Sequence, residues 1–335
     1  MPSRDYIRKL AEQRFDGEVE NAILELIDRV AGEISYEELE ELIRSGDPEA
    51  VARRVADMMP ERSEAILGAM AAAAAASGKQ TVDALRSGLS SSVKVQFKPG
   101  ATRLDERVRA LHTEQIREVT DETRKAIREQ VRLGLERGEN PRDTARRIKG
   151  RWDKRAGKYR GGVIGLTEHQ ERWVRNAERN LREGQYAKYL GRKLRDRRHD
   201  ATVIKAQREG RELTEDQIQR MLTSYRRRAV QYRAETIARD QSLAALDVGQ
   251  EEAADQVEEQ AGIGDEQIIK EWVTAGDSRV RDGHEEIPGM NRGGVPRNEP
   301  FQTPYGPMMR PRDRSAPARA VIQCRCVATM RVRRG

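Results

Sequence analysis

Aromatic side chains are scarce in this chain of 335 residues, of which Phe, Trp and Tyr make up 4%. Charged residues make up 36% of the sequence, and the mean hydropathy is -0.85. A single large core would bury many more aromatic and branched side chains. The composition therefore excludes one large compact domain and favours long helices exposed to solvent, with room for about two or three domains.

Cysteine and long apolar runs are also scarce. Cys324 and Cys326 are the only cysteines of the sequence, too few for a disulfide framework. No segment reaches the roughly 18 consecutive apolar residues that span a bilayer, and residues 1–10 lack the apolar core of a signal peptide. We therefore expect a soluble protein from a reducing cytoplasm that has no membrane contact.

The charges are sorted along the chain. Residues 1–80 carry 10 basic and 17 acidic side chains, whereas residues 141–240 carry 28 basic and 14 acidic side chains. Residues 241–270 are acidic again, with 1 basic and 8 acidic side chains. A block as basic as 141–240 is typical of a surface that binds nucleic acid. The alternative is a set of solvated helix faces with intrahelical ion pairs, because acidic residues are interspersed.

Clusters of arginine in the basic block predict contact with duplex DNA. The planar guanidinium group donates two hydrogen bonds to a phosphate, and such contacts do not read the base sequence. No series of aromatic residues accompanies the clusters, which favours duplex phosphate over stacking on single strands. In the alternative interpretation these side chains meet acidic surfaces, on a partner or in segments 1–80 and 241–270. The predicted DNA-binding residues are Arg146, Arg147, Lys154, Arg155, Arg192, Lys193, Arg195, Arg197, Arg198, Arg226, Arg227 and Arg228.

The apolar periodicity predicts a mainly α protein that ends in a small α+β domain. Capping signals predict where several helices begin. The expected capping residues are Ser35, Asp47, Asn140, Thr167 and Thr214. The predicted domains are a helical N-terminal array over 1–90, a basic long-helix region over 101–250 and the small α+β domain over 251–335.

Two segments depart from the helical pattern. Residues 151–165 are rich in Gly, Arg and Lys and predict a loop, because the context of a phosphate-binding P-loop is missing. Residues 320–332 alternate between apolar and polar side chains, which predicts a strand. Its apolar face would carry Ala320, Ile322, Cys324, Cys326, Ala328, Met330 and Val332. Trp272 and Phe301 are the expected core anchors of the same domain.

A candidate zinc set lies in the C-terminal domain. It consists of His284, Cys324 and Cys326, together with Asp277. Two cysteines that alternate on a strand point the same way, and tetrahedral zinc suits thiolate and imidazole ligands. The alternative is a pair of small buried cysteines beside a histidine that is hydrogen-bonded in a loop. We predict no cofactor apart from this structural zinc ion.

The sequence gives little support for catalysis. His284 could pair with either cysteine as base and nucleophile, but such a pairing from sequence alone is weak. The other histidines lie in polar, helical stretches, and no carboxylate pair stands out in apolar surroundings. We therefore expect no catalytic residues.

Several short motifs follow one another in a specific order over residues 130–335. They are Gly165-Leu-Thr-Glu-His-Gln170, Leu194-Arg-Asp-Arg-Arg-His-Asp200, Tyr232-Arg-Ala-Glu-Thr-Ile-Ala-Arg-Asp240, Trp272, Asp277-Ser-Arg-Val-Arg-Asp-Gly-His284, Gly289, Pro300-Phe301, Pro304-Tyr-Gly306 and Cys324-Arg-Cys326. This ordered combination resembles the phage Mu F-like head-morphogenesis family of minor head (minor capsid) proteins. The chain departs from the family's usual Ala-Arg-Thr-Glu run at Asp240 and Gln241.

The resemblance implies a virion protein of a tailed bacteriophage, made in the host cytoplasm and located inside the capsid near the portal vertex. It implies a non-enzymatic function in head morphogenesis and in DNA packaging or ejection. The implied partners are the portal protein, major capsid or scaffold proteins and double-stranded DNA. Two other classes stay open, namely a nucleic-acid-binding architectural protein outside the virion and a metal-dependent hydrolase.

Overall fold

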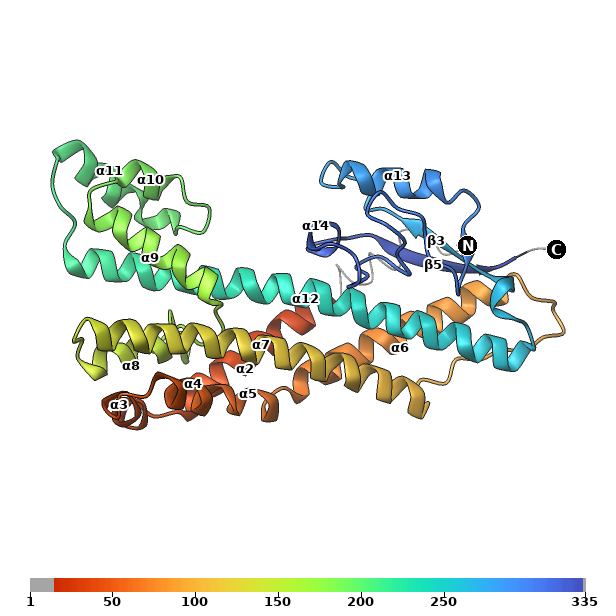
Figure 1. Ribbon diagram of the computed structural model, residues 1–335, viewed down its shortest axis with the longest axis horizontal. Coiled ribbons are helices and arrows are strands. Elements are labelled where there is room, and N and C mark those ends of the chain that lie inside the picture. Colours follow the sequence, from red (N-terminus) through yellow and green to blue (C-terminus); the bar gives the residue numbers. More distant parts are fainter. Residues whose placement is uncertain (1–14, 334–335) are drawn as a thin grey trace. The chain divides into compact units, whose positions relative to one another are not determined.

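The computed structural model describes residues 15–333, which fold mainly into helices with a small α+β region at the C-terminal end (Figure 1). This architecture confirms the predicted fold class. Tertiary contacts divide the chain into two compact units. Unit 1 contains the described residues up to Ala22, Glu64–Glu114 and those from Glu235 onward, and unit 2 contains Ile23–Ser63 and Gln115–Ala234.

Three helices contribute residues to both units. They are α2 (Asp16–Glu33), α7 (Thr102–Glu136) and α12 (Glu215–Ala261). Each unit is therefore built from segments far apart in the sequence, whereas the predicted domains are contiguous ranges. The ranges 1–90, 101–250 and 251–335 stay predictions.

Unit 2 is a helical assembly with one small hairpin. Its helices begin where capping side chains satisfy the first free backbone N–H groups. Ser35 accepts from the backbone of Glu38, and Asp47 and Asn140 accept in the same way. Besides its parts of the three shared helices, unit 2 contains α3 (Tyr36–Arg44), α4 (Pro48–Ala56), α5 (Met58–Glu61), α8 (Pro141–Lys149), α9 (Glu168–Arg182), α10 (Tyr186–Leu190), η2 (Arg197–His199) and α11 (Asp200–Glu209).

The cap predictions at Thr167 and Thr214 are also confirmed. Thr167 accepts from the backbone of Gln170, whose side chain accepts from the backbone of Thr167 in return. Thr214 and Gln217 form the same reciprocal pair at the start of α12. Behind these caps, the apolar faces of α9, α10, α11 and α12 share one buried cluster that includes Leu181, Tyr189 and Leu222.

The prediction of a loop over 151–165 is wrong in part, because the segment contains a two-stranded hairpin. Strand β1 (Arg151–Asp153) pairs with β2 (Lys158–Arg160) in antiparallel register. Gly150 has a φ of 89° and lies so close to the partner strand that a Cβ atom would be 2.5 Å from the Arg160 carbonyl oxygen. The glycines that suggested flexibility thus permit close backbone approach.

Unit 1 combines helices with a three-stranded antiparallel sheet. Strand β3 (Ile268–Val273) is central, between β4 (Val295–Pro296) and β5 (Val327–Val332). The helices α6 (Glu64–Arg86) and α13 (Asp282–Met290) contact β5 and β3, respectively, and the short helix α14 (Ala318–Val321) precedes β5 (Figure 1). Gly249 of α12 packs directly against α6, where a Cβ atom would be 2.0 Å from the Ala74 carbonyl oxygen.

The predicted strand over 320–332 is too long. Residues 318–321 form α14, Ile322 is 60% exposed, and Gln323 has a φ of 55°, so extended pairing begins only at Val327. A left-handed residue breaks the ladder that simple alternation predicts. Within β5 the expected apolar face, with Ala328, Met330 and Val332, is buried.

Trp272 and Phe301 anchor the core of the α+β region, as expected. They are 4% and 0% exposed, and their ring centroids lie 5.3 Å apart in an edge-to-face arrangement. Within residues 15–333, none of the helices combines the length and apolar character needed to cross a bilayer.

Candidate functional sites: a basic surface and a buried His-Cys cluster

The twelve predicted DNA-binding residues fall into two groups in unit 2. Seven donate hydrogen bonds or form ion pairs with side chains of the same unit: Arg146, Arg147, Arg192, Arg195, Arg198, Arg226 and Arg227. The other five are exposed, and they form no ion pair within the described part of the chain: Lys154, Arg155, Lys193, Arg197 and Arg228. The basic block is thus partly used for folding.

Arg226 has a structural role. Its side chain is 8% exposed, and its Nε donates to Glu171 Oε1 at 2.9 Å. Glu171 is fully buried on α9, so the pair ties α9 to α12. A buried pair of this kind cannot reach a phosphate without leaving one charge uncompensated. We therefore exclude Arg226 from the candidate DNA-binding surface.

Asp196 organises two other arginines. Its carboxylate, 1% exposed, accepts from Arg198 at 2.6 Å and from Arg227 at 3.3 Å. The hydrogen bond from Arg198 holds the pKa of Asp196 well below its usual range, against the effect of burial. Arg198 keeps 70% of its side chain exposed, so it can still meet an external anion.

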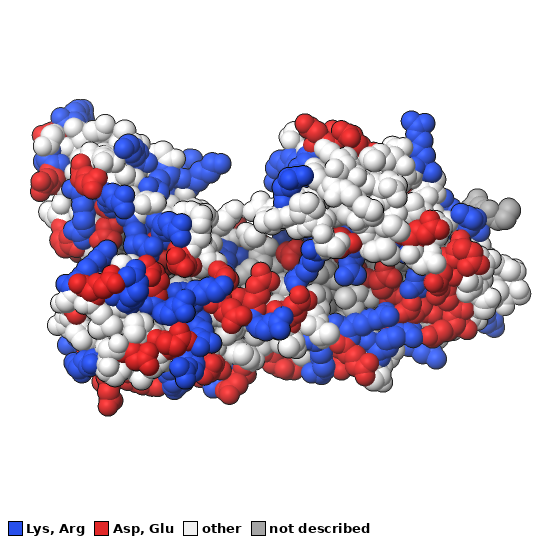
Figure 2. Space-filling view, in the orientation of Figure 1, with Lys and Arg blue, Asp and Glu red and all other residues white. Residues whose placement is uncertain are grey.

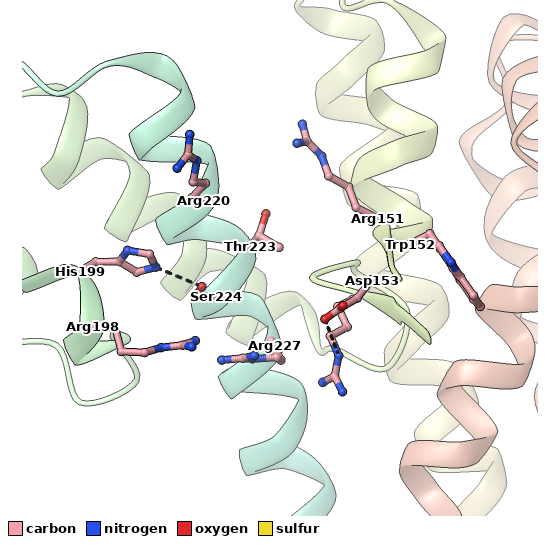
Figure 3. A pocket seen from close by; sticks show the side chains of 10 residues that line it. Arg151, Trp152, Asp153, Arg198, His199, Arg220, Thr223, Ser224 and Arg227 are labelled. Atoms are coloured by element: carbon pink, nitrogen blue, oxygen red, sulfur yellow. Dashed lines mark hydrogen bonds and ion pairs between the residues drawn. The ribbon is translucent and has the colours of Figure 1, made fainter. Parts of the chain in front are cut away.

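These arginines line a pocket of about 480 Å³ in unit 2 (Figure 3). In Figure 3, Arg198, Arg220 and Arg227 lie on one side, with Arg220 uppermost, and Arg151 of the hairpin lies on the other. The remaining lining residues are Trp152, Asp153, Arg160, His199, Thr223 and Ser224. The single carboxylate, Asp153, pairs with Arg160 at 3.4 Å. The pocket therefore has an excess of positive charge, and its His199 imidazole is hydrogen-bonded to Ser224.

Sequence reasoning missed Arg151, Arg160 and Arg220. They stand outside the arginine clusters, and only the hairpin and the turn of α12 bring them to the pocket. Figure 2 shows Lys and Arg side chains gathered over the part of unit 2 that carries α9 and the start of α12, with Asp and Glu side chains between them.

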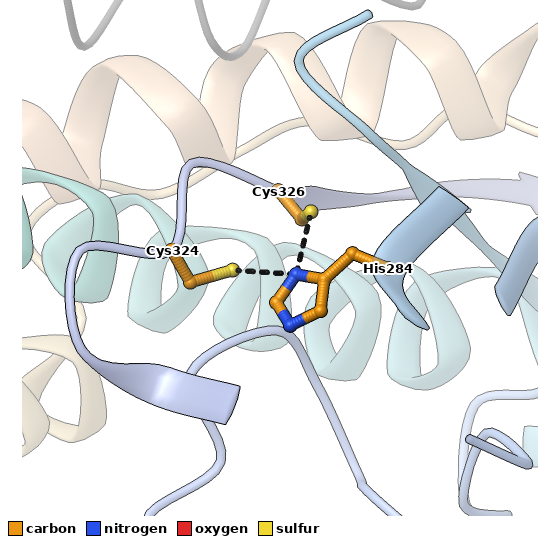
Figure 4. Close-up of side chains that lie close together, drawn as sticks. All are labelled: His284, Cys324 and Cys326. Carbon is orange, nitrogen blue, oxygen red and sulfur yellow. Dashed lines mark hydrogen bonds between the residues drawn. The ribbon is translucent and has the colours of Figure 1, made fainter. Parts of the chain in front are cut away.

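A second site lies inside the α+β region of unit 1. His284 on α13 faces Cys324 and Cys326, which precede β5 (Figure 4). Its Nδ1 is 3.4 Å from the Cys326 sulfur and 3.6 Å from the Cys324 sulfur. Each of the three residues is 2% exposed, and their ligand atoms lie within 4.8 Å of one another. The structure thus brings together three of the four residues of the predicted zinc set.

Asp277, the fourth member of that set, lies elsewhere. It accepts from Arg325 at 2.8 Å and from Arg279 at 3.2 Å. The hydrogen bond from Arg325 holds the pKa of Asp277 well below its usual range. This carboxylate therefore pairs with arginines around the loop before α13 and does not lie in the His-Cys cluster.

A buried arginine lies beside the cysteines. Arg312 donates to the Cys326 carbonyl oxygen and, at 2.6 Å, to Asp247 Oδ2. The pKa of Cys324 is lowered by hydrogen bonds from Cys326 and His284 and by the charge of Arg312. The pKa of Cys326 is raised, because its own ionisation would place a second thiolate beside the first.

Residues 174–329 match the family model described as Phage Mu protein F like protein. The match covers the later part of α9, all of α10, α11 and α12, and most of the α+β region, including the three residues of the His-Cys cluster. No curated protein and no solved structure matches the chain. Over residues 174–329, this chain is therefore similar to the Phage Mu protein F like family, which suggests a bacteriophage head-related protein.

Proposed function

We propose that this chain is a minor head protein of a tailed bacteriophage, without enzymatic activity, that acts at the portal vertex during head assembly and DNA packaging or ejection. The family match over residues 174–329 supports the role in the head. The portal protein and the major capsid or scaffold proteins are its proposed protein partners. Double-stranded DNA is its proposed nucleic-acid partner, bound by the basic surface of unit 2.

The observation that carries the DNA proposal is the convergence of arginines from separate elements on one pocket. The hairpin, η2 and α12 each supply guanidinium groups there. Phosphate oxygens are bound by such groups irrespective of base sequence. Arg197 and Arg228, which are next in sequence to the lining residues Arg198 and Arg227, are exposed.

The acidic block over 241–270 has partners of its own in unit 1. Arg103 donates to Glu252 at 2.8 Å, and Arg107 pairs with Asp255 at 2.8 Å. A third arginine, Arg297, pairs with Glu258 at 2.9 Å. These carboxylates are neutralised inside unit 1, which weakens the alternative that they neutralise the basic block.

The proposal is tested by removing exposed, unpaired charge from unit 2. In the full chain, Lys193, Arg197 and Arg228 are replaced together by Ala, and retention of a duplex DNA of arbitrary sequence on filters is measured at about 50 mM salt. Each lost phosphate contact reduces the electrostatic part of the affinity. We expect the affinity of this triple variant to fall by at least about tenfold.

A matched control removes three exposed basic residues from unit 1: Lys79, Lys94 and Arg292. Its net charge equals that of the first variant, so any non-specific effect of charge is shared. We expect it to retain DNA nearly as well as the wild-type chain. An equal loss in both variants, or no retention of DNA by the wild-type chain, would remove the DNA role.

Docking on the portal is the second candidate for the basic surface. The carboxylates interspersed with the arginines in unit 2 favour it, because mixed charge suits a protein partner with a complementary pattern. Mass spectrometry of purified virions tests the location that both candidates share. Absence of the chain from DNA-filled heads would contradict the virion role and favour an architectural protein outside the virion.

A further inference from the structure

One nitrogen atom in the α+β region faces two sulfur atoms at nearly equal distances. His284 Nδ1 lies 3.4 Å from Cys326 Sγ and 3.6 Å from Cys324 Sγ. A single N–H group points along one line, so it cannot donate a good hydrogen bond to both sulfurs. A central atom bound by all three would account for both distances.

The observed distances match the edges of a zinc tetrahedron. Zinc lies about 2.0–2.1 Å from a histidine nitrogen and about 2.3 Å from a cysteine sulfur. At the tetrahedral angle these bond lengths separate nitrogen and sulfur by about 3.6 Å. We propose that His284, Cys324 and Cys326 bind one zinc ion, a site that goes beyond the proposed function in the phage head.

The donor set suits zinc chemically. Thiolate and imidazole ligands favour zinc over hard cations such as Mg²⁺ and Ca²⁺, which take oxygen ligands. Two thiolates would balance the two positive charges of the ion, and the site is buried, with each ligand 2% exposed.

The surroundings hold the three side chains in place without the metal. The rings of Trp272 and Tyr305 lie 6.0 Å and 5.5 Å from the His284 ring, both edge to face. Arg312 fixes the Cys326 backbone by donating to its carbonyl oxygen. Gln323, with a φ of 55°, turns the chain directly before Cys324. A preorganised set of this kind lowers the entropic cost of binding an ion.

The ligands also join segments that are distant in sequence. His284 belongs to α13, whereas the cysteines are separated from it by 40 and 42 positions and lead into β5. The core cluster around them contains few large side chains besides Trp272 and Phe301. Zinc would therefore link α13 to the sheet where apolar packing is limited. Three protein ligands leave a fourth tetrahedral position for a non-protein ligand.

Elemental analysis of the purified full chain tests the site. The chain is produced without a histidine tag, incubated with zinc chloride and freed of unbound metal, and zinc, copper and iron are measured. We expect about one zinc per chain. The variants Cys324→Ser, Cys326→Ser and His284→Ala should each retain less than about a tenth of an equivalent. His169→Ala, which alters an exposed histidine on α9, should retain the full amount.

A second measurement covers variants that fail to fold. In the wild-type chain, Co²⁺ in place of Zn²⁺ should give the near-ultraviolet absorption of thiolate-to-cobalt charge transfer, and zinc should abolish that absorption. A wild-type chain that binds less than about a tenth of an equivalent of zinc and shows no such absorption would overturn the proposal. Stoichiometric copper or iron in place of zinc would also overturn it.

Discussion

Arginines of the basic block differ in function according to their depth in unit 2. Arg228 is exposed, and it has no ion-pair partner in the part of the chain that the structure describes. Arg226, two residues earlier, is buried against Glu171. Arg233 is buried and donates to the Gly165 carbonyl oxygen, and burial lowers its pKa to about 10. Sequence clusters alone cannot separate these roles, because neighbours on a helix face opposite directions.

The buried pair between Arg226 and Glu171 should be important for stability. We expect Arg226→Leu to destabilise unit 2 by about 3–5 kcal/mol, because it leaves the Glu171 carboxylate buried without a partner. The control is Arg172→Ala, which removes an exposed ion pair with Glu168 and should cost less than about 1 kcal/mol. Urea unfolding followed by circular dichroism measures both. Equal costs would show that the buried pair is not structural.

Lys270 should make the stability of unit 1 depend on pH. It is 2% exposed, and burial lowers its pKa to about 8. Between about pH 8 and pH 10.5 the unfolded chain holds this proton and the folded chain does not, so stability rises with pH across this window. Over this range, the free energy of unfolding of the wild-type chain should rise by up to about 3 kcal/mol relative to that of Lys270→Met.

The test of Lys270 is how the difference in free energy of unfolding between the wild type and Lys270→Met changes with pH. The Met variant also loses the hydrogen bond to the Met309 carbonyl oxygen, but most of that loss is common to all pH values. Lys79→Met, at an exposed position of α6, serves as the control and should show no pH-dependent difference from the wild type. A flat difference for Lys270→Met would contradict the depressed pKa.

At the scale of elements, local signals proved sufficient for helix starts and insufficient for strands. The caps at Asp47, Asn140 and Thr167 follow from side chains within three residues of the groups they satisfy. The hairpin over 151–160 depends on pairing across a turn, which a Gly- and Arg-rich segment does not reveal. Long-range pairing therefore explains the missed hairpin, whereas the overlong strand over 320–332 is explained by α14 and the left-handed Gln323.

The His-Cys cluster was predicted from an expected strand that the structure does not form at the two cysteines. Alternation on a strand would point Cys324 and Cys326 the same way, but both precede β5. Their approach to His284 depends on the left-handed turn at Gln323 and on Arg312, neither of which the sequence pattern indicates. The residue types were informative, whereas the geometry required the fold.

Close packing of α12 against α6 gives a test at the element scale. Gly249→Ala should destabilise unit 1 by about 1–3 kcal/mol, because the added Cβ would meet the Ala74 backbone. Gly68→Ala, in α6, has open space around its Cβ position and should stabilise the helix by about 0.5–1 kcal/mol. Thermal unfolding measures both changes. A neutral Gly249→Ala would show that the two helices can separate at no cost.

At the scale of the whole molecule, the charges that the sequence sorts into blocks are used differently in the two units. The acidic block of α12 is paired with Arg103, Arg107 and Arg297 inside unit 1. The basic block of unit 2 is only partly paired and retains the five exposed residues that form no ion pair within residues 15–333. The net charge of +7 therefore understates the positive charge that unit 2 presents to a partner.

The salt dependence of DNA binding by the full chain tests the central claim most directly. If about five phosphates are neutralised, the logarithm of the affinity should fall with the logarithm of salt concentration with a slope of about -4.5. That slope corresponds to a loss of about 500-fold between 50 and 200 mM salt, and it should be the same for two duplexes of unrelated sequence. A slope near zero, or no binding at 50 mM salt, would contradict a DNA-contacting surface on unit 2.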